Sequence, residues 1–193
     1  MSLHDQSYTP NYLLATMSAA DFKRLQPHLT RVDLAQGACL VAAAQPIEFV
    51  YFPEGGVASI VTDMAGDEIE AGLFGRDGMS GTAVLLGSDT TLDKTFVQID
   101  GATALRMPAA ALVMAVRESE ALRDHLLRFV HVLRLQTTRT AASNARLEVR
   151  QRLARWLLMC HDRVDGDMLA LTHEFIAMML ATRRAGVTVA LHS

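Results

Sequence analysis

Residues 171–191 read LTHEFIAMMLATRRAGVTVAL, two short amphipathic patterns separated by a break. Thr172 is a suitable N-cap for the first pattern, whose apolar side chains recur at helical spacing. The second pattern covers residues 184–191, with Val187 and Leu191 four positions apart. Two short helices joined by a three- or four-residue turn are typical of a helix-turn-helix motif. Because two ordinary amphipathic helices packed together give the same pattern, this stretch alone leaves both interpretations open.

A further helix is predicted directly upstream, over residues 146–163. Its apolar side comprises Leu147, Leu153, Trp156, Leu157 and Cys160. It is expected to end before the turn at residues 164–167, which contains two aspartates and a glycine. Trp156 is the only tryptophan of the chain, and we expect it to anchor a second hydrophobic core.

Residues 118–143 contain neither glycine nor proline and predict one long helix. Its most regular stripe consists of Leu122, Leu126, Phe129, Leu133, Gln136 and Thr140. These positions follow one another at alternating steps of four and three, the a/d spacing of a two-stranded coiled coil. The stripe therefore predicts a homodimer interface. The alternative is that it packs on the chain's own sheet.

The region from residue 32 to residue 107 has a different sequence pattern: short runs rich in β-forming residues, separated by glycines. The runs cover residues 47–52, 57–62, 69–74 and 96–105, and ten of the twelve glycines of the chain lie between Gly37 and Gly101. No long helical pattern separates the runs, which favours an antiparallel roll over a parallel sheet. One or two short helices are predicted ahead of the roll, over residues 11–29.

The charges are divided unevenly along the chain. Residues 1–100 contain 5 Lys and Arg against 13 Asp and Glu, whereas residues 101–193 contain 13 Arg against 8 Asp and Glu. The first part therefore carries −8 and the second +5, which together give the net charge of −3. An acidic part joined to a basic part is typical of a sensor linked to a nucleic-acid-binding domain.

Several classes of protein are excluded. The longest apolar runs, such as residues 109–116, fall far short of the roughly 20 residues that cross a bilayer. The amino terminus lacks a basic start and an apolar stretch, so no secretion signal and a cytoplasmic location are expected. Two distant cysteines, Cys39 and Cys160, provide no ligand set for zinc or an iron–sulfur cluster.

The sequence also lacks the residues that an enzyme of the β-roll type would need. None of the seven histidines lies between residues 32 and 107, so a metal-dependent enzyme of the β-roll type has no ligands there. Glu68 and Glu70 lie two apart on one predicted strand, and we expect a solvated hairpin edge rather than an acid/base pair. The sequence therefore predicts that the protein is not an enzyme.

Four segments resemble a known family: residues 47–57 (IEFVYFPEGGV), 75–81 (GRDGMSG), 152–158 (RLARWLL) and 171–177 (LTHEFIA). Together with the order of the parts, they resemble the Crp/Fnr family of bacterial transcription regulators. The resemblance implies an α+β fold. Its parts are an antiparallel β-roll sensor, a double-stranded β-helix of the cyclic-nucleotide-binding type, at residues 11–116, a dimerisation helix at 117–143 and a partial winged helix-turn-helix at 146–193.

The resemblance also places a ligand pocket at Gly78, Met79, Ser80, Gly81, Lys94 and Thr95. Nucleotide-binding members have a Gly-Glu pair for the ribose and an Arg-Ser or Arg-Thr pair for the cyclic phosphate. Met79 stands where the glutamate would be and accepts no useful hydrogen bond, and Lys94 lacks the guanidinium fork that matches a phosphate. The sequence therefore argues against cyclic AMP, and it leaves the sensed signal unidentified.

The same resemblance assigns DNA contacts to residues of the helix-turn-helix motif: Thr172, His173, Arg183, Arg184 and Thr188. Arginine at the start of a recognition helix can bind guanine N7 and O6 with two hydrogen bonds. Thr188 could contact a phosphate or a thymine methyl group, and Thr172 and His173 a phosphate. Exposed arginines over residues 139–155 would add attraction that is independent of sequence.

The partners implied are a palindromic DNA duplex, a second copy of the chain and RNA polymerase. Family members continue past the second helix into a β-hairpin wing, whereas this sequence stops at Ser193. We therefore expect a truncated carboxyl end and a weakened DNA affinity. The alternative function is a sensor or interaction module without productive DNA binding.

Overall fold

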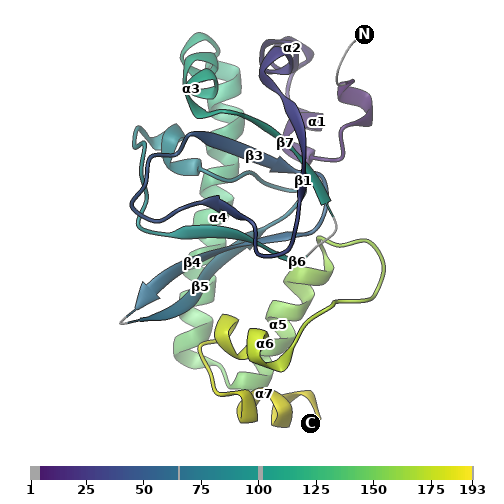
Figure 1. Ribbon diagram of the computed structural model, residues 1–193, viewed down its shortest axis with the longest axis vertical. Coiled ribbons are helices and arrows are strands. Elements are labelled where there is room, and N and C mark those ends of the chain that lie inside the picture. The colour runs from purple at the N-terminus through teal and green to yellow at the C-terminus, as the bar shows by residue number, and fades with distance from the viewer. Residues whose placement is uncertain (1–4, 65, 100–101, 193) are drawn as a thin grey trace.

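The computed structural model describes residues 5–64, 66–99 and 102–192 (Figure 1). The helices are α1 (Tyr12–Thr16), α2 (Ala19–Leu25), α3 (Ala109–Glu118), α4 (Glu120–Arg146), α5 (Val149–His161), α6 (His173–Met179) and α7 (Arg184–Leu191), with short 3-10 turns η1 (Gln6–Tyr8), η2 (Gln26–His28) and η3 (Thr82–Leu86). The strands are β1 (Thr30–Leu34), β2 (Cys39–Val41), β3 (Phe49–Pro53), β4 (Val57–Met64), β5 (Asp67–Phe74), β6 (Lys94–Ile99) and β7 (Ala102–Pro108). None of the described helices is both long enough and apolar enough to cross a membrane.

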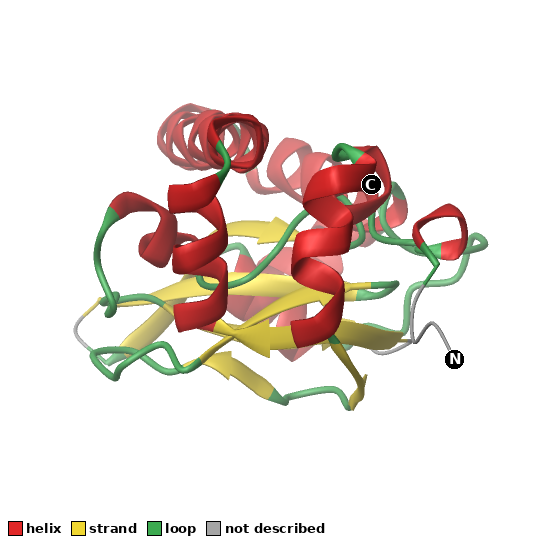
Figure 2. Ribbon diagram, turned by 90° about the horizontal axis from the view of Figure 1, so that it is seen from above, coloured by secondary structure: helices red, strands yellow, loops and turns green. Residues whose placement is uncertain are grey.

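The strands form two antiparallel sheets that confirm the predicted roll. One sheet has the order β1-β7-β3 and the other β2-β6-β4-β5. The predicted run over residues 96–105 is divided between β6 and β7, which lie in different sheets. Seen along the long axis of the molecule, the strands lie in layers, and most of the helices lie above or in front of them in this view (Figure 2).

The long helix α4 begins later than predicted because Ser119 separates it from α3. The Ser119 hydroxyl accepts a hydrogen bond from the backbone N–H of Leu122, and so caps α4. The 27 residues of α4 then run without a break beside the roll and lead to the carboxyl-terminal helices (Figure 1).

The stripe predicted as a dimer interface faces the chain's own roll, which corrects that assignment. Leu122, Leu126, Phe129 and Leu133 are buried in the main hydrophobic core. Gln136 accepts a 2.9 Å hydrogen bond from the backbone N–H of Leu73 in β5, and Thr140 accepts one from Arg155. The spacing predicts a buried face correctly, but the roll covers the stripe from Leu122 to Gln136 and α5 lies against Thr140, in place of a second copy of the helix.

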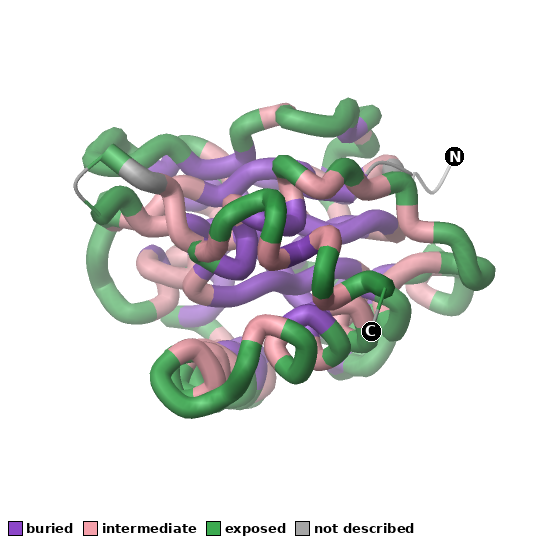
Figure 3. Tube along the Cα trace, turned by 90° about the horizontal axis from the view of Figure 1, so that it is seen from below, coloured by how far each residue is buried: buried purple, intermediate pink, exposed green. Residues whose placement is uncertain are grey.

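A second core joins the carboxyl-terminal helices to the outer face of the four-stranded sheet. The sheet contributes Val57, Val61, Leu73, Phe96 and Ile99, and the helices contribute Leu153, Trp156, Cys160, Ile176 and Val187 among others. The prediction that Trp156 anchors a second core is confirmed. Seen from below, buried segments follow the strands, and many exposed segments lie at the rim (Figure 3).

Candidate nucleic-acid interface

The helix-turn-helix consists of α6 and α7, with the predicted cap in place. Thr172 Oγ1 accepts a 3.2 Å hydrogen bond from the backbone N–H of Phe175, and α7 covers the predicted residues Arg184–Leu191. In the turn, Ala181 adopts a left-handed conformation with φ of 45°, and Thr182 N–H donates to Ala177 O. These bonds fix the direction in which α7 leaves the turn.

The side chains predicted to contact DNA gather at the start of α7 and beside it. Arg183 and Arg184 are exposed. Arg184 Nη1 lies 2.6 Å from Glu174 Oε1 of α6, in an ion pair whose side chains are 67% and 61% exposed. Because so exposed a pair is weakly held, the guanidinium of Arg184 is available to another anion.

His173 and Thr188 are brought together by the fold. The Thr188 hydroxyl donates to the carbonyl of Arg184, and it lies 3.1 Å from His173 Nδ1. A hydroxyl has one proton, so His173 Nδ1 acts as the donor to Thr188 Oγ1. This bond links α6 to α7, which gives both side chains a role in holding the motif together.

The arginines predicted as a basic surface divide into two groups. Arg152 donates to the carbonyl of Leu180 and to Asn144, and Arg155 donates to Thr140, and burial lowers the pKa of both guanidinium groups. The other three, Arg139, Arg146 and Arg150, are exposed. The surface available to a phosphate backbone is therefore smaller than the sequence suggested.

The start of α7 also borders an open groove. Its walls are the turn and the first residues of α7, including Thr182 and Arg183, and the β4–β5 hairpin with Glu68 and Ile69. The exposed arginine end of α7 thus lies near an acidic hairpin of the roll.

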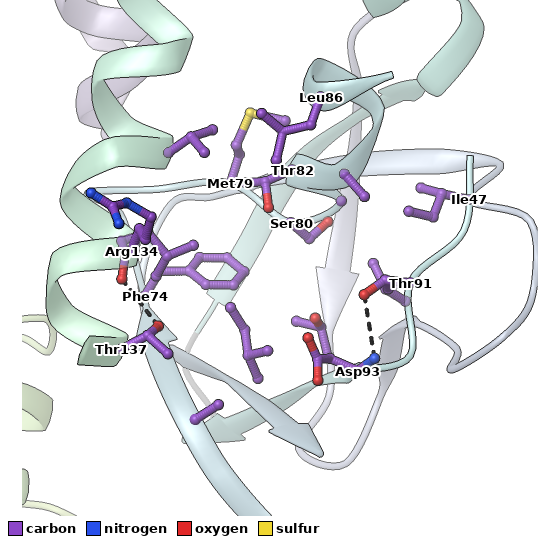
Figure 4. A pocket seen from close by; sticks show the side chains of 18 residues that line it. Ile47, Phe74, Met79, Ser80, Thr82, Leu86, Thr91, Asp93, Arg134 and Thr137 are labelled. Carbon is purple, nitrogen blue, oxygen red and sulfur yellow. Dashed lines mark hydrogen bonds between the residues drawn. The ribbon is translucent and has the colours of Figure 1, made fainter. Parts of the chain in front are cut away.

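The roll contains a cavity of about 260 Å³ next to α4 (Figure 4). Four of the six predicted pocket residues line it: Met79, Ser80, Gly81 and Thr95. The remaining lining is mainly aliphatic, with threonine hydroxyls and two charged side chains, Asp93 and Arg134.

The other two predicted pocket residues lie elsewhere, which corrects their assignment. Lys94 pairs with Glu68 at 2.8 Å and lies 5.2 Å from the centre of the Phe96 ring. Gly78 packs against Phe129 of α4. Among the described residues, no group of His, Cys, Asp and Glu is arranged to hold a metal ion.

The prediction that Glu70 lies at a solvated hairpin edge is wrong. Glu70 is 3% exposed, not solvated, because Trp156 of α5 lies against it and the second core surrounds it. Trp156 Nε1 donates to Glu70 Oε1 at 2.9 Å, and Ser59 Oγ lies 2.7 Å from Oε2. Burial raises the pKa of Glu70 to about 8, against the opposing effect of these two hydrogen bonds.

Comparison with known proteins agrees with this geometry. Residues 151–193 match the family model of the Crp-like helix-turn-helix domain. A search among curated proteins gives no match.

Several solved structures share the fold. The c-di-GMP-responsive global regulator CLP of Xanthomonas campestris has a TM-score of 0.74 at 18% identity, over 91% of this chain and 90% of that chain. A Crp/Fnr-family transcriptional regulator from Eubacterium rectale has a TM-score of 0.73 at 16% identity, over 95% and 86% of the two chains. FixK2 from Bradyrhizobium japonicum has a TM-score of 0.69 at 16% identity, over 85% and 83%.

The comparisons show the fold of the chain and the kind of its carboxyl-terminal motif. The chain shares its fold with solved regulators, one of them of the Crp/Fnr family, and its residues 151–193 match a Crp-like helix-turn-helix domain. The resemblance predicted from the sequence is confirmed.

Proposed function

We propose that this protein is a homodimeric transcription regulator that inserts α7 into the major groove of a palindromic DNA site. The observation that carries the proposal is the exposure of Arg183 and Arg184 at the start of α7, within the residues that match the helix-turn-helix family model. A recognition helix contacts base edges through its first residues. We assign base contact to Arg184 and phosphate contact to Arg183. Thr172, His173 and Thr188 hold the motif and border the same surface.

The second copy of the chain would pack against the outward face of α4. Val132 is 60% exposed and Leu135 is 47% exposed, on the side of the helix opposite Leu126 and Leu133. Exposed aliphatic residues on a long helix gain by burial against an equivalent helix. The dimer would then hold two α7 helices at a fixed separation, as a palindromic site requires.

The cavity is our candidate for the sensor site. Part of its wall comes from α4, through Val130, Leu133, Arg134 and Thr137. A molecule bound there would contact the helix that leads to the DNA-binding domain. Differential binding to two arrangements of α4 would change the spacing of the two α7 helices.

We place this regulator in the cytoplasm, where its DNA target lies, with RNA polymerase as a further candidate partner. Two of the solved structures of similar fold described above are of regulators, and the proposal includes no enzymatic activity.

Fluorescence anisotropy with a labelled random-sequence duplex, at low and moderate salt, tests DNA binding. The proposal predicts binding that weakens with salt, with a log–log slope of about −0.9 per phosphate neutralised. The double variant Arg183→Ala, Arg184→Ala should weaken binding and reduce the slope. The control Arg117→Ala removes an exposed charge from α3, at the opposite end of the molecule from α7 (Figure 1), and should bind like the wild type.

Absence of binding at low salt would contradict the proposal. That result would favour the alternative of a sensor or interaction module that does not engage DNA productively.

A further inference from the structure

A buried polar cluster connects the roll to the DNA-binding domain. It contains Glu70 of β5, Ser59 of β4, Gln98 of β6 and Trp156 of α5. Each is at most 3% exposed, and Ser59 and Gln98 are fully buried. The cluster lies where α5 covers the outer face of the four-stranded sheet. The hydrogen bond from Trp156 to Glu70 crosses between the two domains and so depends on their docking, whereas the bonds of Ser59 lie within the sheet.

Counting protons relates the charge state of Glu70 to the orientation of the Gln98 amide. Ser59 Oγ contacts both Glu70 Oε2 and Gln98 Oε1, but a hydroxyl has one proton to donate. With the amide oriented as in the structure, Ser59 Oγ donates its hydrogen bond to Gln98 Oε1 and accepts one from the carboxyl of Glu70, which must then be protonated and neutral. Gln98 Nε2 then has no partner among the described residues.

The opposite amide orientation suits an ionised carboxylate. Gln98 Nε2 would donate to Ser59, and Ser59 would donate to Glu70. The carboxylate would then receive two hydrogen bonds, from Ser59 and Trp156, inside an apolar core. Hydrogen bonds from two neutral donors stabilise a buried carboxylate by less than its desolvation destabilises it. The cluster can hold the ionised form of Glu70, but the desolvation of its carboxylate then disfavours the docked arrangement. Separation of the domains removes this penalty because water reaches the carboxylate.

The charged neighbours do not cancel this cost. Arg155 of α5 and Arg163, which follows α5, both favour the ionised form from a distance, and neither forms an ion pair with Glu70 among the described contacts. Arg163 pairs with Asp77 at 2.6 Å instead. Cys160 of α5 also faces the carboxyl, and burial together with Glu70 raises the pKa of its thiol. From β4 and β6, Ser59 and Gln98 contribute no charge.

We propose that Glu70 and Trp156 form a latch that holds the DNA-binding domain on the sensor sheet while the carboxyl is neutral, and that loss of the proton weakens the docking. Glu70 is a positioning residue, because it sets the position of α5 and contacts neither DNA nor a ligand. Two ion pairs, Arg163 with Asp77 and Arg76 with Asp165, cross the same interface near its edge.

The direction of the pH effect follows from proton binding. The pKa of Glu70 is about 8 when docked and near its ordinary value of 4.5 when exposed to water. Between these values the docked form binds more protons, so the docking constant falls as pH rises, by up to about tenfold per pH unit. Above about pH 8 both forms are ionised and the docking constant levels off.

Acrylamide quenching of the single tryptophan tests the latch without DNA. Trp156 is 3% exposed when docked, so the quenching constant reports its exposure. For the wild type, we expect the constant to increase severalfold from pH 5.5 to pH 8 and then to level off. Glu70→Gln keeps a neutral donor to Ser59 and should remove the increase. Glu68→Gln, two positions along the same strand and paired with Lys94, should retain it.

A second variant keeps the test informative if Glu70→Gln fails to fold. Ser59→Ala removes a donor to the ionised carboxylate, so the increase should extend to higher pH. A wild-type constant that does not change with pH, or an increase that persists in Glu70→Gln, would overturn the latch. Since no DNA is present, this failure is distinct from a failure of DNA binding.

Discussion

Gly78 lies directly against Phe129, so close that a Cβ on Gly78 would be 2.6 Å from Cζ of the ring and 2.9 Å from Cβ of Phe74. The glycine belongs to the loop between β5 and η3, and the ring belongs to α4. Glycine is therefore required here for close approach rather than for an unusual backbone angle. The contact fixes α4 against the loop that also provides Met79 and Ser80 to the cavity.

Gly78→Ala should reduce the free energy of unfolding by about 1–3 kcal/mol, because the added methyl group displaces a packed ring. Urea denaturation measures this change. In a Phe129→Ala background the same substitution should cost much less, since its main obstacle is gone. An equal cost in both backgrounds would show that the ring is not the obstacle.

The two faces of α4 should respond differently to substitution. Leu126→Ala, on the buried face, should reduce the free energy of unfolding by about 2–5 kcal/mol. Leu135→Glu, on the exposed face, should leave monomer stability nearly unchanged and abolish the dimer, as measured by analytical ultracentrifugation. Dimerisation that survives Leu135→Glu would place the interface elsewhere.

Arg184 should matter for DNA binding and little for stability. Its exposed ion pair with Glu174 contributes at most about 1 kcal/mol, so Arg184→Ala should change the unfolding free energy by no more than that. If the guanidinium contacts a guanine, the same change should weaken specific binding by about 1–3 kcal/mol. Glu174→Gln frees Arg184 and removes a negative charge, so it should strengthen binding to random duplex. Weaker binding of Glu174→Gln would contradict this account of the pair.

Global stability should also report the charge state of Glu70. The folded protein binds one more proton than the unfolded chain between pH 4.5 and about 8, so this residue lowers the unfolding free energy as pH rises through that range. The slope is at most about 1.4 kcal/mol per pH unit. Urea denaturation at pH 5.5 and pH 8 should show wild type losing stability relative to Glu70→Gln. Parallel behaviour of the two proteins would exclude a neutral Glu70 in the folded state.

Local features of the sequence predicted local structure well. Thr172 caps α6, and α7 covers the predicted residues, because caps and helical periodicity act over a few neighbouring positions. The antiparallel roll followed in the same way from short runs and glycine turns. The alternation of side chains along a strand would have improved the prediction of the pocket residues. Lys94 and Thr95 are adjacent in β6, and since neighbours in a strand point to opposite faces, only one of them could line the cavity.

Features that depend on distant segments could not be predicted from spacing. The stripe from Leu122 to Gln136 would have the same pattern against a second helix or against the chain's own roll, and in the structure it packs on the roll. Glu70 would be solvated in an isolated hairpin, and it is buried because α5, about 80 positions later, packs over it. Trp156, the only tryptophan, indicated that its helix packs on a second core, but it did not indicate that its hydrogen-bond partner is Glu70.

Selection of bound sequences from a pool of random DNA duplexes tests the central claim most directly. A homodimeric regulator that reads DNA through α7 should enrich an inverted repeat, with half-sites centred about 10 base pairs apart or a multiple of that distance. The double variant Arg183→Ala, Arg184→Ala should lose the enrichment. A pool without any enriched sequence, or an enriched site without two-fold symmetry, would contradict the account.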